Sequence, residues 1–205
     1  MFNRKCKITF ISHGSTIYSE DNKFYDKADY PPLNDNGYKE IKKITDFIKK
    51  RGLKTNKIYV SSALRCVQSA EIISEALKQD FEIVETLENR EWGVWSGMTY
   101  DELEKKYKNE YQTLNDIFAS KPENGEDVVC FNERINKALS QIISDNIRGR
   151  VIIITHPAVI QAAIANALEI SSKNQFKLYI RPASATQISY FTDWASLVYS
   201  DHVPN

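Results

Sequence analysis

The sequence lacks a net charge, because its 27 lysines and arginines are balanced by 27 aspartates and glutamates over 205 residues. A chain without excess positive charge has no overall field that would hold DNA, RNA or an anionic membrane surface. We therefore expect neither nucleic acid nor membrane as a partner. Any site that binds an anion must be built locally, from a few side chains.

Cysteines and long apolar runs are also scarce. Cys6, Cys66 and Cys130 are an odd number without the spacing of metal ligands, which predicts reduced thiols and no metal site. The apolar run near the N-terminus is too short for a signal peptide or a membrane-spanning helix, so we expect a cytoplasmic protein. Because internal repeats and low-complexity linkers are absent, residues 1–205 are expected to form a single domain. No feature of the sequence indicates an oligomeric state.

What the sequence does contain is an alternation of strand-like and helix-like segments. Short β-branched runs predict strands, and apolar residues at intervals of three and four predict amphipathic helices. This order predicts an α/β fold, a three-layer sandwich with a mostly parallel central sheet and helices on both faces. Residues 92–126 break the alternation and are expected to form a helical insertion over the pocket. The expected strands are 8–11, 57–61, 81–84, 151–154, 186–191 and 196–199, and the expected helices are 36–51, 67–77, 127–147 and 157–168.

Two of the predicted strands end in a histidine. His13 follows the strand at 8–11, and His156 follows the strongly apolar strand at 151–154. Ligands of such sheets bind beyond the carboxyl ends of the strands, so both histidines are expected at the ligand-binding edge.

Six short motifs spread over nearly the whole chain carry the clearest functional information. They are Ser12-His13-Gly14-Ser15-Thr16, Pro32-Leu33-Asn34-Asp35-Asn36-Gly37, Ser61-Ser62-Ala63-Leu64-Arg65-Cys66-Val67-Gln68-Ser69-Ala70, Gly93-Val94-Trp95-Ser96-Gly97, Asn124-Gly125-Glu126 and Thr155-His156. Each motif alone is weak evidence, but six in the correct order are strong. Together they resemble the motifs of branch one of the histidine phosphatase superfamily, the phosphoglycerate mutase-like branch.

The resemblance implies a phosphate pocket and assigns roles to three residues. His13 would be the nucleophile that forms a phosphohistidine, Arg65 a bidentate phosphate clamp and His156 a further donor to the phosphoryl oxygens. This chemistry uses no cofactor. The expected partner is a small phosphorylated substrate, or a phosphate or sulfate anion.

Three positions in the same pocket depart from the family pattern. Ser12 replaces the arginine before the nucleophile, Ser19 replaces an asparagine, and Asn89 replaces the glutamate that serves as general acid. Losing one oxyanion donor costs about 10²–10³ in rate, and losing a general acid costs about 10²–10⁴. Glu88 and Glu91 flank Asn89, and either could supply the acid if the loop turns differently. Ser12, Ser19, Glu88 and Asn89 are thus the candidate substrate-binding residues.

Two functions from different classes follow from this pattern. The first is a phosphomonoesterase that acts on a small phosphorylated metabolite through a phosphohistidine, with reduced activity. The alternative is a catalytically silent pseudoenzyme that binds a phosphorylated ligand or a protein partner. A phosphoglycerate mutase is disfavoured, since it needs a pocket that protects the phosphoenzyme from water.

Several polar and aromatic residues outside these roles also carry expectations. Trp92, Trp95 and Tyr100 could line a substrate cleft, but we favour packing of the insertion onto its domain. Glu126 is expected to cap the helix that begins near residue 127. His202 lies outside the motifs and is expected at the surface or in packing.

Overall fold

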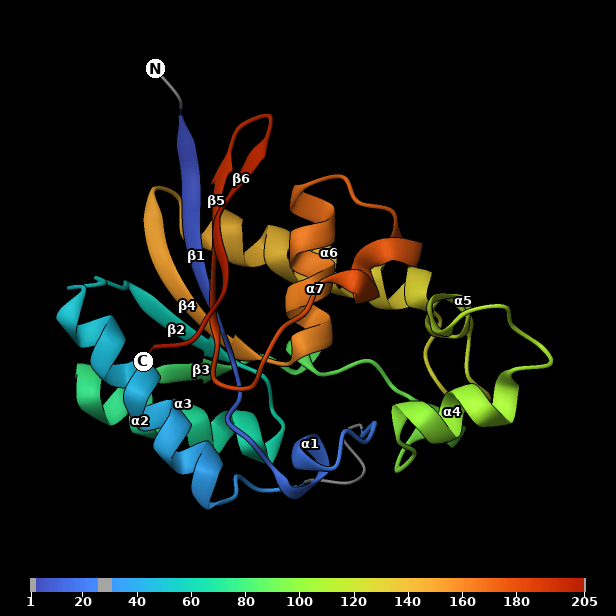
Figure 1. The fold of residues 1–205 in the computed structure, drawn as a ribbon. Coiled ribbons are helices and arrows are strands. Elements are labelled where there is room, and N and C mark those ends of the chain that lie inside the picture. The colour runs from blue at the N-terminus through green and yellow to red at the C-terminus, as the bar shows by residue number, and fades with distance from the viewer. Residues whose placement is uncertain (1–2, 26–30, 205) are drawn as a thin grey trace.

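A six-stranded sheet forms the centre of the computed structural model, which describes residues 3–25 and 31–204 (Figure 1). The strand order is β3-β2-β4-β1-β5-β6, and the first four of these strands pair in parallel. The last two, β5 and β6, pair antiparallel with their neighbours. The predicted mostly parallel sheet is confirmed. Its strands are β1 Arg4–Ser12, β2 Lys57–Val60, β3 Phe81–Ile83, β4 Gly149–Thr155, β5 Ala185–Phe191 and β6 Ala195–His202.

Helices cover both faces of the sheet, as predicted. The helices α2 (Asp35–Lys50) and α3 (Leu64–Leu77) lie on one face, and α6 (Val128–Asp145) and α7 (Pro157–Ala167) lie on the other (Figure 1). Side chains of β4 alternate between the two layers: Ile152 packs with the α2 and α3 side, and Ile153 packs with the α6 and α7 side. A strand buried on both faces explains the continuous apolar run.

Residues 92–126 form short helices beside the sheet: η3 (Gly93–Trp95), α4 (Tyr100–Tyr107) and α5 (Leu114–Ala119) (Figure 1). Two of the motifs hold this segment together. Gly93 has a φ of +53°, and a Cβ there would lie 2.1 Å from the Glu123 carbonyl oxygen. The Gly-x-Trp and Asn-Gly-Glu motifs therefore meet backbone to backbone, at a distance that only glycine permits.

Packing of the insertion agrees with the expectation for two of the three aromatic residues for which it was stated. Trp92 and Trp95 are buried, whereas Tyr100 is 45% exposed. Beneath them lies Arg90, which is fully buried and donates to the carbonyl oxygens of Phe118 and Ser120, each at 2.6 Å. This arginine, which the motifs did not single out, ties the insertion to the rest of the molecule.

The predicted cap of α6 is wrong by one residue. Asp127, not Glu126, accepts the bond from the Val129 amide at 2.7 Å, because its shorter side chain lies at the N-cap position. Glu126 instead forms an ion pair with Arg134 at 2.7 Å.

Three short helices had no counterpart among the predicted elements. They are α1 (Ile17–Glu20), η2 (Glu85–Leu87) and η4 (Ser172–Lys177). Each is too short to show an apolar period, so pattern reasoning could not find them.

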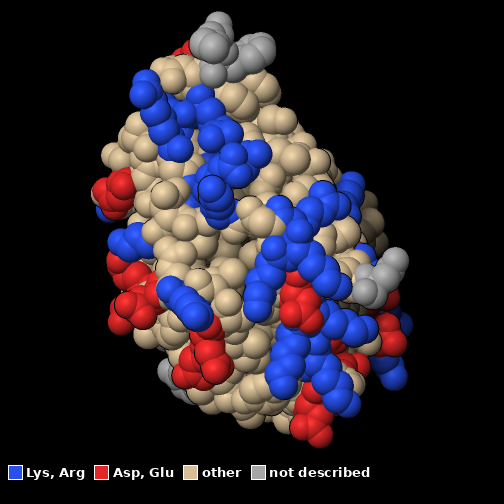
Figure 2. Space-filling model, turned by 90° about the vertical axis from the view of Figure 1, so that its left-hand side faces the viewer, with Lys and Arg blue, Asp and Glu red and all other residues tan. Residues whose placement is uncertain are grey.

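Charge is unevenly spread although the total is zero. Figure 2 shows lysines and arginines gathered near the N-terminal end of the molecule and down one side of that face. Burial, followed by the positive charges of Arg4 and Arg150, lowers the pKa of Lys7. No helix within the described residues is long and apolar enough to cross a bilayer.

The three cysteines are free thiols. Cys6 and Cys66 are buried and Cys130 is exposed. Burial raises the pKa of Cys6 to about 11 and that of Cys66 to about 12, so both stay protonated at neutral pH. Among the described residues, no three His, Cys, Asp or Glu side chains gather as metal ligands would.

Candidate active site

His13 lies at the carboxyl end of β1 with its lone pair directed into the site. Its amide donates to the Thr155 carbonyl oxygen at 2.9 Å, which continues the pairing of β1 with β4 past the end of the sheet. The next residue, Gly14, packs on the backbone of Gly37, and a Cβ there would lie 2.6 Å from the Gly37 carbonyl oxygen. The loop that carries His13 is therefore clamped against the start of α2.

The ring of His13 has a defined protonation state. Its Nδ1 lies 2.8 Å from the Gly14 carbonyl oxygen, which can only accept, so Nδ1 carries the proton and Nε2 the lone pair. Burial, followed by the positive charge of Arg65, lowers the pKa of His13 to about 3. The imidazole is neutral at physiological pH and available as a nucleophile.

Arg65 and His156 come from two helix N-termini and meet beside His13. Arg65 lies in the first turn of α3, and His156 is the N-cap residue of α7. The Arg65 Nη2 atom donates to His156 Nδ1 at 3.2 Å, and the two histidine ring centroids are 5.3 Å apart. The structure thus brings together His13, Arg65 and His156, which are far apart in the sequence.

The contacts of His156 also define its tautomer. Because Nδ1 accepts from Arg65, the proton is on Nε2, which donates to Ser61 Oγ at 2.9 Å. Burial and the charge of Arg65 lower the pKa of His156 well below its usual value, so this ring is neutral as well. In this arrangement His156 orients the guanidinium of Arg65.

Several buried donors around His13 have no partner within the described part of the chain. They are Nε and Nη1 of Arg65 and the hydroxyl of Ser12, all of which are inaccessible to solvent. A buried donor without an acceptor costs about 1–3 kcal/mol, and more when it is charged. A phosphoryl group would supply the acceptors that these donors need.

Tyr25, which the sequence did not point to, lies over this cluster. Its hydroxyl is 3.4 Å from His13 Nε2 and 3.4 Å from the Thr16 hydroxyl. The guanidinium of Arg65 lies over its ring, with Cζ 4.6 Å from the centroid. Tyr25 therefore occupies the space in front of the nucleophile that a phosphorus atom must enter.

Asn89 holds Tyr25 in this position. Its Nδ2 donates to the Tyr25 carbonyl oxygen at 3.0 Å. An ionised carboxylate has no proton to donate, so a glutamate at this position could not make the bond. The departure at Asn89 thus has a structural consequence besides the loss of an acid.

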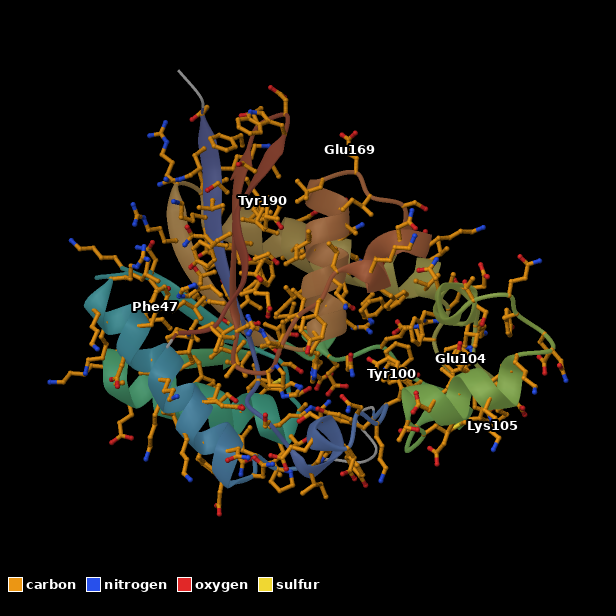
Figure 3. The ribbon with its side chains drawn as sticks, viewed as in Figure 1. Phe47, Tyr100, Glu104, Lys105, Glu169 and Tyr190 are labelled. Carbon is orange, nitrogen blue, oxygen red and sulfur yellow. The ribbon has the colours of Figure 1, made fainter. Side chains whose placement is uncertain are left out.

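A cavity of about 360 Å³ opens beside His13. Of the candidate site residues, His13, Ser19 and Asn89 line it, whereas Ser12, Arg65, Glu88 and His156 do not. Tyr100 belongs to its wall, on the inner side of α4 (Figure 3). The wall is largely aromatic and apolar, with Phe24, Tyr25, Trp92, Tyr100, Phe118, Phe176, Leu178, Tyr179 and Ile180. Trp92 and Tyr100 therefore line a cleft after all, although Trp92 is also part of the packed insertion.

Glu88 and Glu91 line a different cavity, of about 550 Å³, which also includes Asn89. Glu88 accepts a hydrogen bond from the Ser62 hydroxyl. Neither carboxylate lies along the cavity beside His13, so the described residues offer no carboxylic acid there in place of Asn89.

Comparisons with known proteins identify the family of this chain. The chain matches the family model for the histidine phosphatase superfamily (branch 1) over residues 8–201. It is 26% identical over 192 residues to the 2,3-bisphosphoglycerate-dependent phosphoglycerate mutase of Parvibaculum lavamentivorans, which covers 91% of this chain and 90% of that protein.

A second curated relative is longer than this chain. A bifunctional protein of Mycobacterium tuberculosis is 23% identical over 193 residues, which covers 94% of this chain but 52% of that protein. The chain thus spans about half the length of the first curated relatives that it matches. Among solved structures, a mutant phosphoserine phosphatase from Entamoeba histolytica in complex with phosphoserine has a TM-score of 0.79 at 20% identity, with 96% of each chain covered. This likeness concerns the fold.

Proposed function

Because the chain belongs to the histidine phosphatase superfamily (branch 1), we propose that it is a phosphomonoesterase acting through phospho-His13. The observation that carries the proposal is the buried cluster of one guanidinium with unpartnered donors and a neutral imidazole, whose Nε2 lone pair lies at a long 3.4 Å from the Tyr25 hydroxyl. Phosphoryl transfer needs little from a protein beyond a positioned nucleophile and positive charge around the equatorial oxygens. The cavity volume suits a small phosphorylated metabolite.

In the first step Nε2 of His13 attacks phosphorus, and the bond between phosphorus and the ester oxygen breaks. The leaving oxygen takes the electron pair and a proton from solvent, and Arg65 balances the charge on the transferred group. The ring of Tyr25 must first leave the space in front of Nε2, since its hydroxyl is 3.4 Å from that atom.

In the second step water attacks the phosphorus of phospho-His13. The bond between nitrogen and phosphorus breaks, Nε2 recovers its lone pair, and inorganic phosphate departs. Nδ1 of His13 keeps its proton and donates it in a hydrogen bond to the Gly14 carbonyl oxygen throughout. Nε2 is therefore the reactive nitrogen in both steps.

Two observations favour the alternative of a silent pseudoenzyme: Tyr25 covers His13, and Asn89 holds Tyr25 there. Ser12 also favours the pseudoenzyme, because one neutral hydroxyl replaces the charged guanidinium of the family's arginine. We propose activity with a reduced rate, since these features raise the barrier without removing the nucleophile.

The test is to incubate the protein with an activated aryl phosphate and to follow both phosphate release and phosphohistidine by mass spectrometry. His13→Ala is expected to abolish both signals. His202→Ala is the matched control, because the third histidine packs on Phe47 outside the site and its loss is expected to leave turnover unchanged. Equal phosphate release by the wild type and His13→Ala would refute the proposal.

A further inference from the structure

The described residues that line the cavity beside His13 include no carboxylic acid that could protonate a leaving group, and the charged side chains among them are Lys23 and Lys177. The position expected to carry the acid is Asn89. A general acid contributes about 10²–10⁴ to a rate. A substrate whose ester oxygen leaves easily as an anion needs no such help.

The wall of the same cavity is built for a flat apolar group. The ring of Phe24 lies 4.9 Å from that of Trp92 and 4.7 Å from that of Tyr100, and Tyr100 packs on Phe118 at 5.7 Å. These rings form one continuous surface that begins next to His13. Aromatic groups bind such surfaces through offset or edge-to-face contacts, each of which is worth about two- to tenfold in affinity.

From these two observations we propose that the substrate is an aryl phosphate, the monoester of a phenol, with its ring against the wall formed by Phe24, Trp92 and Tyr100. This inference rests on the proposed phosphatase function. Nε2 of His13 forms the bond to phosphorus, the bond from phosphorus to the phenolic oxygen breaks, and the phenoxide leaves with the electron pair. A proton from solvent then neutralises the phenoxide.

Leaving-group chemistry decides between esters of phenols and esters of alkyl alcohols. A phenol such as that of tyrosine has a pKa of about 10, whereas an alkyl alcohol is a far weaker acid, nearly as weak as water. Without a carboxylic acid among the described residues of the cavity, the alkyl ester loses the factor of about 10²–10⁴ that protonation would supply. The aryl ester keeps most of its rate.

Three substrates separate the chemistry from the binding surface. Phenyl phosphate has both the ring and the good leaving group, benzyl phosphate has the ring but an alkyl leaving group, and phosphoserine has neither. Phenyl phosphate is expected to have the highest kcat/KM, by about 100-fold or more over benzyl phosphate. Benzyl phosphate is expected to inhibit competitively, with a Ki within tenfold of the KM for phenyl phosphate.

The outcomes distinguish this inference from the function on which it rests. A preference for phenyl phosphate below tenfold, or faster turnover of phosphoserine, would overturn the aryl assignment while phosphohistidine formation still supported a phosphatase. Failure of every ester to form phospho-His13 would overturn both.

A pair of variants tests whether the aromatic wall binds the substrate ring. Tyr100→Ala is expected to raise the KM for phenyl phosphate about fivefold with little change in the KM for phosphoserine. Tyr38→Ala is the control, because Tyr38 is a similarly exposed tyrosine on α2 that does not line the cavity. Equal KM values for phenyl phosphate in the two variants would show that the substrate ring does not contact Tyr100.

Discussion

Replacing Tyr25 with alanine is expected to strengthen phosphate binding, although it removes a side chain from the site. The hydroxyl of Tyr25 lies 3.4 Å from His13 Nε2, and its ring lies under Arg65, so a phosphoryl group and this ring compete for the same space. Every binding event in the wild type must first displace the ring.

The contacts of the ring set the size of the effect. A desolvated cation–π contact such as that with Arg65 is worth about 2 kcal/mol, and the hydrogen bonds of the hydroxyl, long at 3.4 Å, add up to about 1 kcal/mol. A cost of about 2–3 kcal/mol lowers the apparent affinity about 30- to 150-fold, since each 1.4 kcal/mol is a factor of ten. Tyr25→Ala should recover most of that factor.

Isothermal titration with inorganic phosphate and with vanadate measures this directly. Tyr25→Phe is the matched control: it keeps the ring and the contact with Arg65, so its affinity should change less than about fivefold. Thermal unfolding of each variant checks that the fold is intact. A folded Tyr25→Ala protein that binds phosphate no more tightly than the wild type would refute the competition between ring and phosphate.

Three further predictions concern His13, Asn89 and Arg90. The folded protein holds His13 neutral with a pKa of about 3, whereas the unfolded chain binds a proton near pH 6.5, so the free energy of unfolding should fall as the pH drops from 6.5 to 4. In urea unfolding, His13→Gln should reduce the dependence of the unfolding free energy on pH in this range by about 1.4 kcal/mol per pH unit. An unchanged pH dependence would contradict a buried, neutral His13 ring. Asn89→Glu should accelerate hydrolysis of benzyl phosphate by about 10²-fold or more relative to Asn89→Gln, provided that the carboxyl group faces His13; equal rates in the two variants would argue that position 89 cannot protonate a leaving group. Arg90→Met should lower the unfolding free energy by about 3 kcal/mol, because three carbonyl oxygens lose their buried donor, while Arg181→Met, which breaks the more exposed pair with Asp201, should cost under about 1 kcal/mol. Similar losses in both would show that Arg90 is not an anchor.

The sheet and the meeting of the two histidines could be predicted from the sequence for a simple physical reason. Parallel strands that alternate with helices place their carboxyl ends at one edge, so His13 and His156 had to lie at that edge. The register agrees, since Ser12 pairs with Thr155, the residues just before the two histidines. The ends of helices and strands were less predictable. The first strand was expected at residues 8–11 but begins at Arg4, because the terminal residues of a strand need not be apolar.

Tyr25 and Arg90 could not be predicted, because their roles depend on tertiary contacts that leave no local pattern. Tyr25 reaches His13 across a loop, and Arg90 finds acceptors about thirty residues away along the chain. A buried arginine looks like any surface arginine in a sequence. The hydrogen bond from Asn89 to Tyr25 was hidden in the same way, although the departure from glutamate at that position was visible and marked it as unusual.

The charge of the site explains the position of Tyr25 and its hydrogen bond from Asn89. Arg65 is a fully buried cation that forms no ion pair with a carboxylate within the described residues, and the two neighbouring imidazoles are neutral and cannot compensate it. An isolated buried charge is costly, and the negative face of an aromatic ring is one of the few groups that can offset it. Tyr25 supplies that face over Arg65, and the amide of Asn89 fixes the backbone that carries it. Under the proposed function, Tyr25 occupies the place of the phosphoryl group, and a ligand that displaces it would bring the anion that Arg65 needs.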